Sequence, residues 1–145
     1  FYWWAGSEVC KGQHSGDRLK GARRLSEQRE PDLPPLNVCR QVNVDDEASK
    51  SGVPLAGVAE LAEQIEALPN LRLRGLMAIP RADNDDGNRG AFRQLAMTLS
   101  QLRNTMPGLD TLSMGMSADY AVAIEEGATV IRLGTALFGP RPPKA

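Results

Sequence analysis

The chain has 145 residues, of which 41% are hydrophobic and 24% are charged, a balance that indicates one globular domain rather than a disordered or fibrous chain. A formal net charge of -1 at pH 7 provides no overall basic field, which argues against nucleic acid or an anionic membrane as a partner. Two distant cysteines, Cys10 and Cys39, and the single His14 do not make a metal site. No apolar stretch approaches the roughly 20 residues needed to cross a bilayer. The two cysteines read as reduced thiols, so we expect a cytoplasmic protein.

The chain divides into two regions of different composition. Residues 1–16 combine four aromatic side chains with a stretch rich in Gly, Ser and Gln, and we assign them no structure. Residues 17–145 read as one domain. Apolar residues recur every three positions from Arg18 to Gln28, which predicts a helix ended by the prolines that follow.

A strand is predicted over Leu36–Val44, where the two faces differ in character. The valines at 38, 42 and 44 share one parity and suit a face covered by helices. The opposite parity carries Asn37, Cys39, Gln41 and Asn43, and in a barrel of parallel strands it would face the interior. A ligand or a polar network could satisfy those side chains.

Helices and strands alternate along the rest of the chain. Apolar spacing predicts helices over 55–68, 92–106 and 118–126, and short apolar runs predict strands over 71–79, 111–115 and 129–133. One helix separates each strand from the next, so the crossover rule makes the four strands parallel and the fold α/β. Arg72 and Arg74 alternate on the second strand and read as solvent or end-of-strand charges.

Two segments after the last two strands are candidates for binding a phosphate. Ser117 lies where a strand meets a helix, so it is either a plain N-cap or part of an anion site built on free main-chain N–H groups. Gly134 and Thr135 directly follow the last strand. In (β/α)8 barrels the loops after strands 7 and 8 commonly build a phosphate cradle, which would make these segments neighbours.

Arg132 interrupts a strand that is otherwise apolar. Its parity is opposite to that of Ile131 and Leu133, which suit the helix side, so we expect its guanidinium to point into the mouth of the barrel. A buried cation there needs an acceptor. The acceptor is either a ligand or a carboxylate from another strand, and the residue alone leaves both open.

Five separated stretches together carry a family resemblance. They are Pro34–Val38, Asn43–Gly52, Leu73–Ile79, Leu112–Asp119 and Val130–Gly139. In this order and spacing they resemble the pyridoxal phosphate homeostasis protein family, which is related to the N-terminal domain of alanine racemase. The resemblance runs from about Asp17 to Phe138.

This resemblance implies the C-terminal half of a (β/α)8 barrel, with about four parallel strands, covering helices and pyridoxal 5′-phosphate (PLP) at the carboxyl ends of the strands. The residues that match cofactor-binding positions of the family are Ser117, Gly134 and Thr135 at the phosphate, Arg132 at the pyridine nitrogen, Met77 in the pocket lining and Lys50 near the mouth.

The same resemblance implies a binding protein rather than an enzyme, and we assign no catalytic residue. A cation beside the ring nitrogen disfavours its protonation, and an unprotonated ring is a weak electron sink. Storage or transport of PLP in intracellular homeostasis is therefore expected. One alternative is a fragment of a PLP-dependent racemase, which needs a lysine and a tyrosine as opposed bases; Tyr120 is poorly placed for that role and no partner lysine is visible.

The family's Schiff-base lysine belongs to the first barrel strand, which has no counterpart here, so we expect a truncated chain whose PLP binding is weak or lost. Four strands cannot close a barrel, and unpaired strand edges favour self-association. Full-length members of the family are expected to be monomers, whereas this half could pair with a second copy. A non-enzymatic, oligomerising half-barrel is thus a further alternative.

Overall fold

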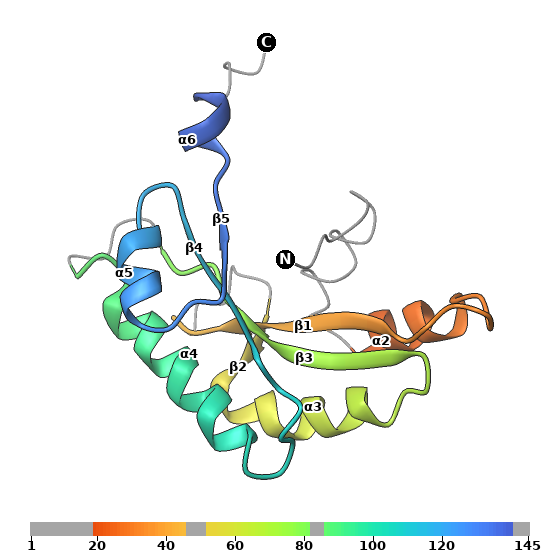
Figure 1. Cartoon of the computed structure of the whole chain (residues 1–145). Helices are drawn as coiled ribbons and strands as arrows, with labels where there is room; N and C mark the ends of the chain where they lie inside the picture. The colour runs from red at the N-terminus through yellow and green to blue at the C-terminus, as the bar shows by residue number, and fades with distance from the viewer. Residues whose placement is uncertain (1–18, 46–51, 82–85, 141–145) are drawn as a thin grey trace.

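The computed structural model describes residues 19–45, 52–81 and 86–140, and Figure 1 shows the arrangement of their helices and strands. In chain order the elements are α2 (Leu19–Glu27), β1 (Leu36–Asn43), β2 (Val53–Pro54), the 3-10 helix η1 (Leu55–Gly57), α3 (Val58–Glu66), β3 (Leu71–Met77), α4 (Arg89–Leu102), β4 (Thr111–Met116), α5 (Tyr120–Glu125), β5 (Val130–Arg132) and α6 (Thr135–Phe138). No helix among these elements is long and apolar enough to span a membrane.

The strands form one sheet in the order β2-β1-β3-β4-β5, and every neighbouring pair is parallel. The four predicted strands are confirmed, and so is the parallel α/β architecture. Two short elements were not predicted. The strand β2 pairs Val53 with Val42 at the end of β1, and the helix α6 begins at Thr135, where only a loop was expected.

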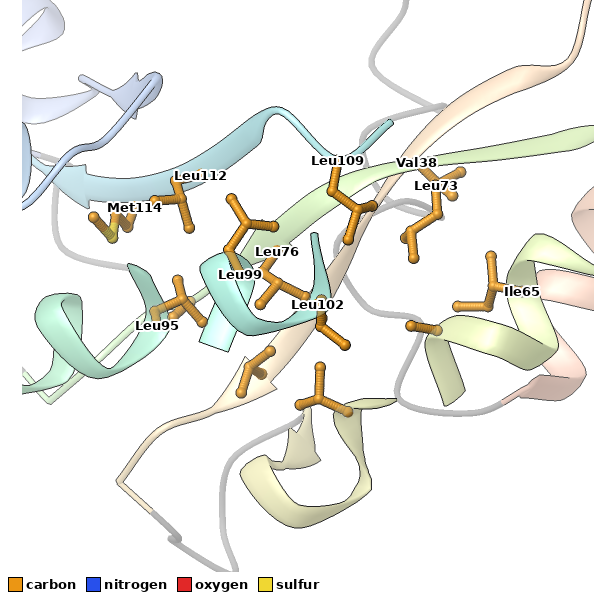
Figure 2. Close-up of a cluster of buried hydrophobic side chains, with 14 of the residues drawn as sticks. Val38, Ile65, Leu73, Leu76, Leu95, Leu99, Leu102, Leu109, Leu112 and Met114 are labelled. Atoms are coloured by element: carbon orange, nitrogen blue, oxygen red, sulfur yellow. The ribbon is translucent and has the colours of Figure 1, made fainter. Parts of the chain in front are cut away.

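One face of the sheet packs against α3 and α4 and forms the hydrophobic core (Figure 2). Leu73, Leu76 and Leu112 come from the strands, and Leu95 and Leu99 come from α4. Full burial of each such side chain is worth about 1.5–3 kcal/mol. This apolar contact holds the helices against the sheet and leaves the opposite face for other side chains.

The opposite face carries a different set of buried residues. Cys39 and Met77 are 5% and 0% exposed, yet neither belongs to the core cluster. Register pairs Met77 with Gln41 on one side and with Ser113 on the other, so these three side chains form a row on that face. Cys39, two residues before Gln41 and therefore on the same face, pairs with Gly75. The prediction that Cys39 and Gln41 lie away from the valines therefore agrees with the structure.

An irregularity in register changes the parity of β3 halfway along the strand. Val38 pairs with Leu73, but the next residue of β1, Cys39, pairs with Gly75, which leaves Arg74 as an extra residue. Leu73 lies in the helix-side core before this point, and Leu76 lies there after it. The side chains of β3 thus exchange faces at Arg74.

Gly75 allows β3 and β4 to approach each other at this irregular point. A Cβ atom on Gly75 would lie 1.8 Å from the main-chain oxygen of Thr111, far inside any permitted contact. Only glycine fits such a position. The sheet beside the candidate site therefore depends on the absence of a side chain here.

The expectation that Arg74 is merely a solvent or end-of-strand charge is wrong, whereas Arg72 is exposed as predicted. Arg74 forms an ion pair with Asp110, in which its Nε lies 3.0 Å from the Oδ1 atom, and its side chain is only 15% exposed. Hydrogen bonding from Arg74 lowers the pKa of the Asp110 carboxyl below its ordinary value. The pair joins β3 to the residue before β4.

Candidate functional site

Ser117 lies in the turn between β4 and α5, beside the segment that follows β5. Its Oγ accepts a hydrogen bond from the main-chain N–H of Ala136 at 3.0 Å, a contact between residues 19 positions apart. Ala136 follows Gly134 and Thr135 directly, so the structure brings the two predicted phosphate segments together. The alternative reading of Ser117 as an N-cap is wrong, because Asp119 is the N-cap residue of α5.

The segment after β5 offers open space beside its main chain. Gly134 and Thr135 are exposed, and nothing lies within 4 Å of the position that a Cβ atom on Gly134 would take. The helix α6 starts here, with Gly134 as its N-cap residue. A small anion can therefore approach this backbone without displacing a side chain.

Arg132 lies at the end of β5 and reaches across β4. Its Nη2 donates a hydrogen bond to the main-chain oxygen of Ala78, the residue after β3, at 2.8 Å. The Nε atom of Arg132 is buried and has no hydrogen-bond partner among the described residues. Burial lowers the pKa of Arg132 from its ordinary value, while the nearby charge of Asp119 acts in the opposite direction.

Arg132 was expected to contact either a ligand or a carboxylate from another strand. Within residues 19–45, 52–81 and 86–140, the ion pairs do not include Arg132, and its hydrogen bond goes to a main-chain carbonyl rather than to a carboxylate. The neighbouring Ile131 lies on the other side, with its Cγ2 atom 3.5 Å from the position of a Cβ atom on Gly115, close to α5. The guanidinium thus lies across the face that the core helices do not cover.

Met77, Ser113 and Cys39 are buried on the face that Arg132 crosses. Ser113 is 2% exposed, and its Oγ has no hydrogen-bond partner in the described part of the chain. Sequence reasoning missed Ser113, although a serine inside the apolar run 112–116 was a visible signal. Burial first, and the charge of Asp110 second, raises the pKa of the Cys39 thiol to about 12, although Arg74 and Arg132 oppose that shift.

Gly115 shapes the turn that carries Ser117. Its φ of +94° lies in the region that favours glycine, and a Cβ atom there would lie 2.6 Å from the Cβ of Ala123 in α5. The main chain near the end of β4 can therefore lie close to α5, just before Ser117. Lys50, the predicted residue near the mouth, lies outside the described residues.

The donors gathered at this end of the sheet suit a phosphorylated aromatic ligand. Ser117 and the main chain from Gly134 to Ala136 offer uncharged donors to an anion, and Arg132 has a buried N–H available to a ring acceptor. Met77 adds an apolar surface beside them. Phosphate-binding groups and a ring-facing cation are the features that a PLP site needs, so the residues fit that cofactor.

Comparison with known proteins finds one matching family model and several similar curated proteins. The family model described as alanine racemase, N-terminal domain, matches residues 13–142. Over 129 residues the chain is 59% identical to the pyridoxal phosphate homeostasis protein of Pseudomonas aeruginosa and 50% identical to that of Escherichia coli K12. Each match covers 88% of this chain and 55% of the relative, so the chain spans about half the length of the curated relatives it matches.

A solved structure is similar to this chain in its fold. PipY of Synechococcus elongatus, determined with PLP bound, matches with a TM-score of 0.77 and 30% identity, covering 90% of this chain and 66% of PipY. The predicted fold class is thereby confirmed, because the parallel sheet and its helices form part of an alanine racemase-type (β/α) barrel.

Proposed function

The chain belongs to the family of the alanine racemase N-terminal domain, and on this premise we propose that it binds PLP at the carboxyl ends of β4 and β5 and takes part in cytoplasmic PLP homeostasis. Two relatives carry the name pyridoxal phosphate homeostasis protein, and the similar PipY was solved with PLP bound. The proposal assigns the phosphate to Ser117, Gly134 and Thr135, the ring to Arg132 and Met77, and a place near the mouth to Lys50.

One observation carries the proposal: the 3.0 Å contact between the Ser117 hydroxyl and the N–H of Ala136. It joins the segment after β4 to the segment after β5, and adjacent strand ends are where barrels of this type hold phosphates. When a phosphate is bound, the Ala136 N–H and the Ser117 hydroxyl can both donate to its oxygens. Hydrogen bonds to a charged group are roughly twice as strong as those between neutral groups.

Arg132 gives the site its chemical character. The bound cofactor can supply electron withdrawal through its ring, but that capacity depends on a protonated ring nitrogen. A guanidinium facing the nitrogen donates a hydrogen bond and disfavours that protonation. The hydrogen bond to Ala78 holds the guanidinium in place on β5. We therefore propose holding or carrying of PLP, by weak and non-covalent contacts in this chain, rather than catalysis.

Self-association is part of the same proposal. Within the described sheet, β2 pairs only with β1 and β5 pairs only with β4, and an unpaired edge can accept another strand. Leu137 and Phe138, just beyond β5, are 68% and 87% exposed. Sedimentation of the chain over a range of concentrations should show a dimer; a monomer at every concentration would refute this part.

Titration of the chain with PLP and with pyridoxal, which lacks the phosphate, tests the cofactor assignment. Binding of both ligands is followed by isothermal titration calorimetry, and binding of PLP also by its ³¹P resonance. We expect PLP to bind at least about tenfold more tightly than pyridoxal, because charge-assisted hydrogen bonds to the phosphate each contribute about 1.5–3 kcal/mol. Equal affinities, or no binding of either ligand, would overturn the proposal.

A matched pair of serine variants locates the phosphate. Ser117→Ala should weaken PLP binding by about tenfold and leave the affinity for pyridoxal almost unchanged, because it removes one donor to the phosphate. Ser100, exposed on α4, provides the control, and Ser100→Ala should bind both ligands as the parent chain does. If Ser117→Ala and Ser100→Ala bind PLP equally well, the phosphate is held elsewhere.

A further inference from the structure

Asn88 and Asp119 are both N-cap residues, yet neither side chain caps its own helix. The Asn88 Nδ2 donates a hydrogen bond to Asp119 Oδ2 at 2.7 Å, across 31 residues of sequence. The other carboxylate oxygen, Oδ1, accepts the main-chain N–H of Met116 at 2.7 Å. Asn88 is thus connected, through one carboxylate, to the turn that contains Ser117.

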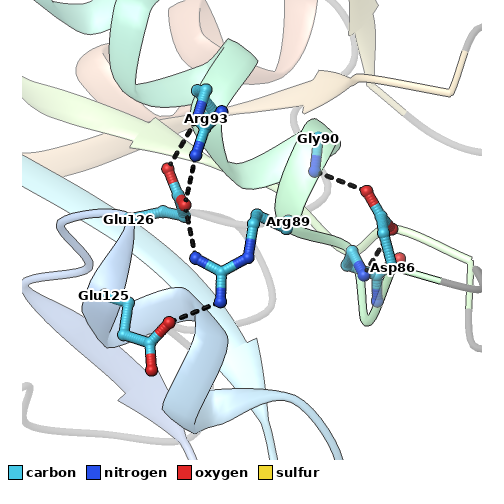
Figure 3. A network of polar contacts seen from close by, with 7 residues as sticks. Asp86, Arg89, Gly90, Arg93, Glu125 and Glu126 are labelled. Atoms are coloured by element: carbon cyan, nitrogen blue, oxygen red, sulfur yellow. Dashed lines mark hydrogen bonds and ion pairs between the residues drawn. The ribbon is translucent and has the colours of Figure 1, made fainter.

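The side chain of Asn88 is available for this contact because Asp86 performs the capping at α4. Asp86 accepts the N–H of Asn88 at 3.0 Å and the N–H of Gly90 at 2.8 Å, the second of which is visible in Figure 3. Asn88 itself is 4% exposed and has a left-handed φ of 69°, a conformation that asparagine tolerates better than most residues. Its amide is therefore held in one direction.

The far end of α5 is joined to the same part of α4. Glu126 Oε1 accepts from Arg89 at 2.7 Å and from Arg93 at 3.0 Å, and Arg89 also pairs with Glu125 (Figure 3). Both ends of α5 are consequently fastened to the first turns of α4. The Asn88 contact therefore restrains the turn before α5.

Asp119 needs such a partner if a phosphate binds nearby. It lies two residues from Ser117, and its charge is close enough to influence Arg132. A free carboxylate in that position could turn toward the ligand and repel it, since like charges disfavour each other. The N–H groups of Asn88 and Met116 occupy both of its oxygens and fix its orientation.

We propose that Asn88 is a positioning residue of the phosphate site: through Asp119 it fixes the turn 116–119 and so aims the Ser117 hydroxyl at the segment 134–136. This inference rests on the proposed function, because it names the residue that supports the same phosphate. Asn88 touches neither Ser117 nor that segment through a hydrogen bond in the described structure, so its effect is transmitted by Asp119.

Exchange of the two side chains tests the connection. Asn88→Asp places two carboxylates against each other and should weaken PLP binding by about tenfold or more, while pyridoxal binding changes little. In the double variant Asn88→Asp with Asp119→Asn, the amide of residue 119 can donate to residue 88 while its oxygen still accepts from Met116. We expect PLP affinity to return to within about threefold of the parent, roughly 0.6 kcal/mol.

The control is Asn104→Asp, the same change in charge at an exposed position beyond α4, which should leave binding unchanged. Parent-like PLP binding by Asn88→Asp would overturn the inference. So would equal losses for PLP and pyridoxal, because they would indicate a general effect on the fold, and so would a double variant that recovers nothing.

Hydrogen exchange at the Met116 amide gives a readout that does not require PLP. Loss of the Asn88 contact in Asn88→Ala should loosen Asp119 and accelerate exchange of this amide about fivefold or more, with no change in core amides of β3. If the parent chain fails to bind PLP, the proposed function falls while this measurement still decides the connection. If Met116 exchange is unaffected, the inference falls, whatever the affinity for PLP.

Discussion

Arg132 and Ala78 are joined across an intervening strand. The guanidinium leaves β5, passes β4 and donates to the carbonyl oxygen that follows β3, at 2.8 Å. This hydrogen bond holds the Arg132 side chain across the sheet. The buried Nε–H of Arg132 has no protein acceptor among the described residues. The arrangement supports a cation that is positioned before a ligand arrives.

Replacement of this cation should affect the ring of the ligand rather than its phosphate. Arg132→Gln is expected to weaken binding of PLP and of pyridoxal alike, by about tenfold, because both compounds share the pyridine nitrogen. Isothermal titration calorimetry measures both affinities. Arg72→Gln, at an exposed position on β3, is the matched control and should change neither. A loss confined to PLP would place Arg132 at the phosphate and contradict the assignment.

Gly75→Ala should destabilise the fold severely. The added methyl group would lie 1.8 Å from the Thr111 carbonyl oxygen, so β3 and β4 must separate, at a cost of more than about 3 kcal/mol. Urea unfolding followed by circular dichroism measures this change. The control is Gly21→Ala in α2, where nothing lies within 4 Å, and a gain of about 0.5–1 kcal/mol is expected. Similar stabilities for the two variants would contradict the close approach.

The thiol of Cys39 should be unreactive in the folded chain. It is 5% exposed, and burial raises its pKa to about 12, so almost no thiolate is present at pH 8. In a Cys10→Ser background, labelling of Cys39 by a thiol reagent at pH 8 is expected to be at least about a hundredfold slower than in urea. Equal rates with and without urea would show that Cys39 is accessible.

The same pKa predicts a loss of stability at alkaline pH. The folded-state pKa lies above the ordinary value of 9.0, so folding favours the protonated thiol. Its contribution is complete below pH 9 and is lost as the pH rises from 9 toward 12. Relative to Cys39→Ala, the parent should lose about 1.4 kcal/mol by pH 10. A difference between the two chains that stays constant from pH 8 to pH 10 would contradict the shift.

Glu126 should contribute to stability at neutral pH and lose that contribution in acid. Hydrogen bonds from Arg93 and then Arg89 lower its pKa below the ordinary value of 4.5. A lowered carboxyl pKa stabilises the fold above the unfolded-state value and ceases to do so as the pH falls through the folded-state value. The gap in melting temperature between the parent and Glu126→Gln should therefore be present at pH 7 and close below about pH 4.5. The exposed Glu63→Gln on α3 is the control.

Most of the fold follows from local sequence patterns, and the elements that were not predicted are those without such a pattern. The strand at 36–43 and the helix at 58–66 have strong apolar periodicity, so sequence alone predicts them closely. The two-residue strand Val53–Pro54 has no periodicity to detect, because it exists only by pairing with β1. Arg74 reads as a surface charge from the sequence, because its partner Asp110 is 36 residues away and becomes its neighbour only in the folded sheet.

The candidate site divides in the same way. Arg132 and Ser117 attract attention because each is a polar residue at the end of an apolar strand. Asn88 gives no such signal, since its partner Asp119 lies 31 residues away and only the packing of α4 beside α5 brings them together. Ser113 was detectable in principle, as a hydroxyl in an apolar run, but its burial without a partner needs coordinates.

The surplus residue in β3 has a consequence for evolution and for design. With uninterrupted alternation after Leu73, the strand would direct Met77 toward α4 and present Leu76 and Ala78 to the opposite face of the sheet. A one-residue deletion at Arg74 would therefore restore regular alternation, with Leu76 still on the core side and Met77 still on the opposite face. Homologues that are one residue shorter at this point can therefore keep the same residues on the same surfaces, and an alignment should place the gap at the surplus residue.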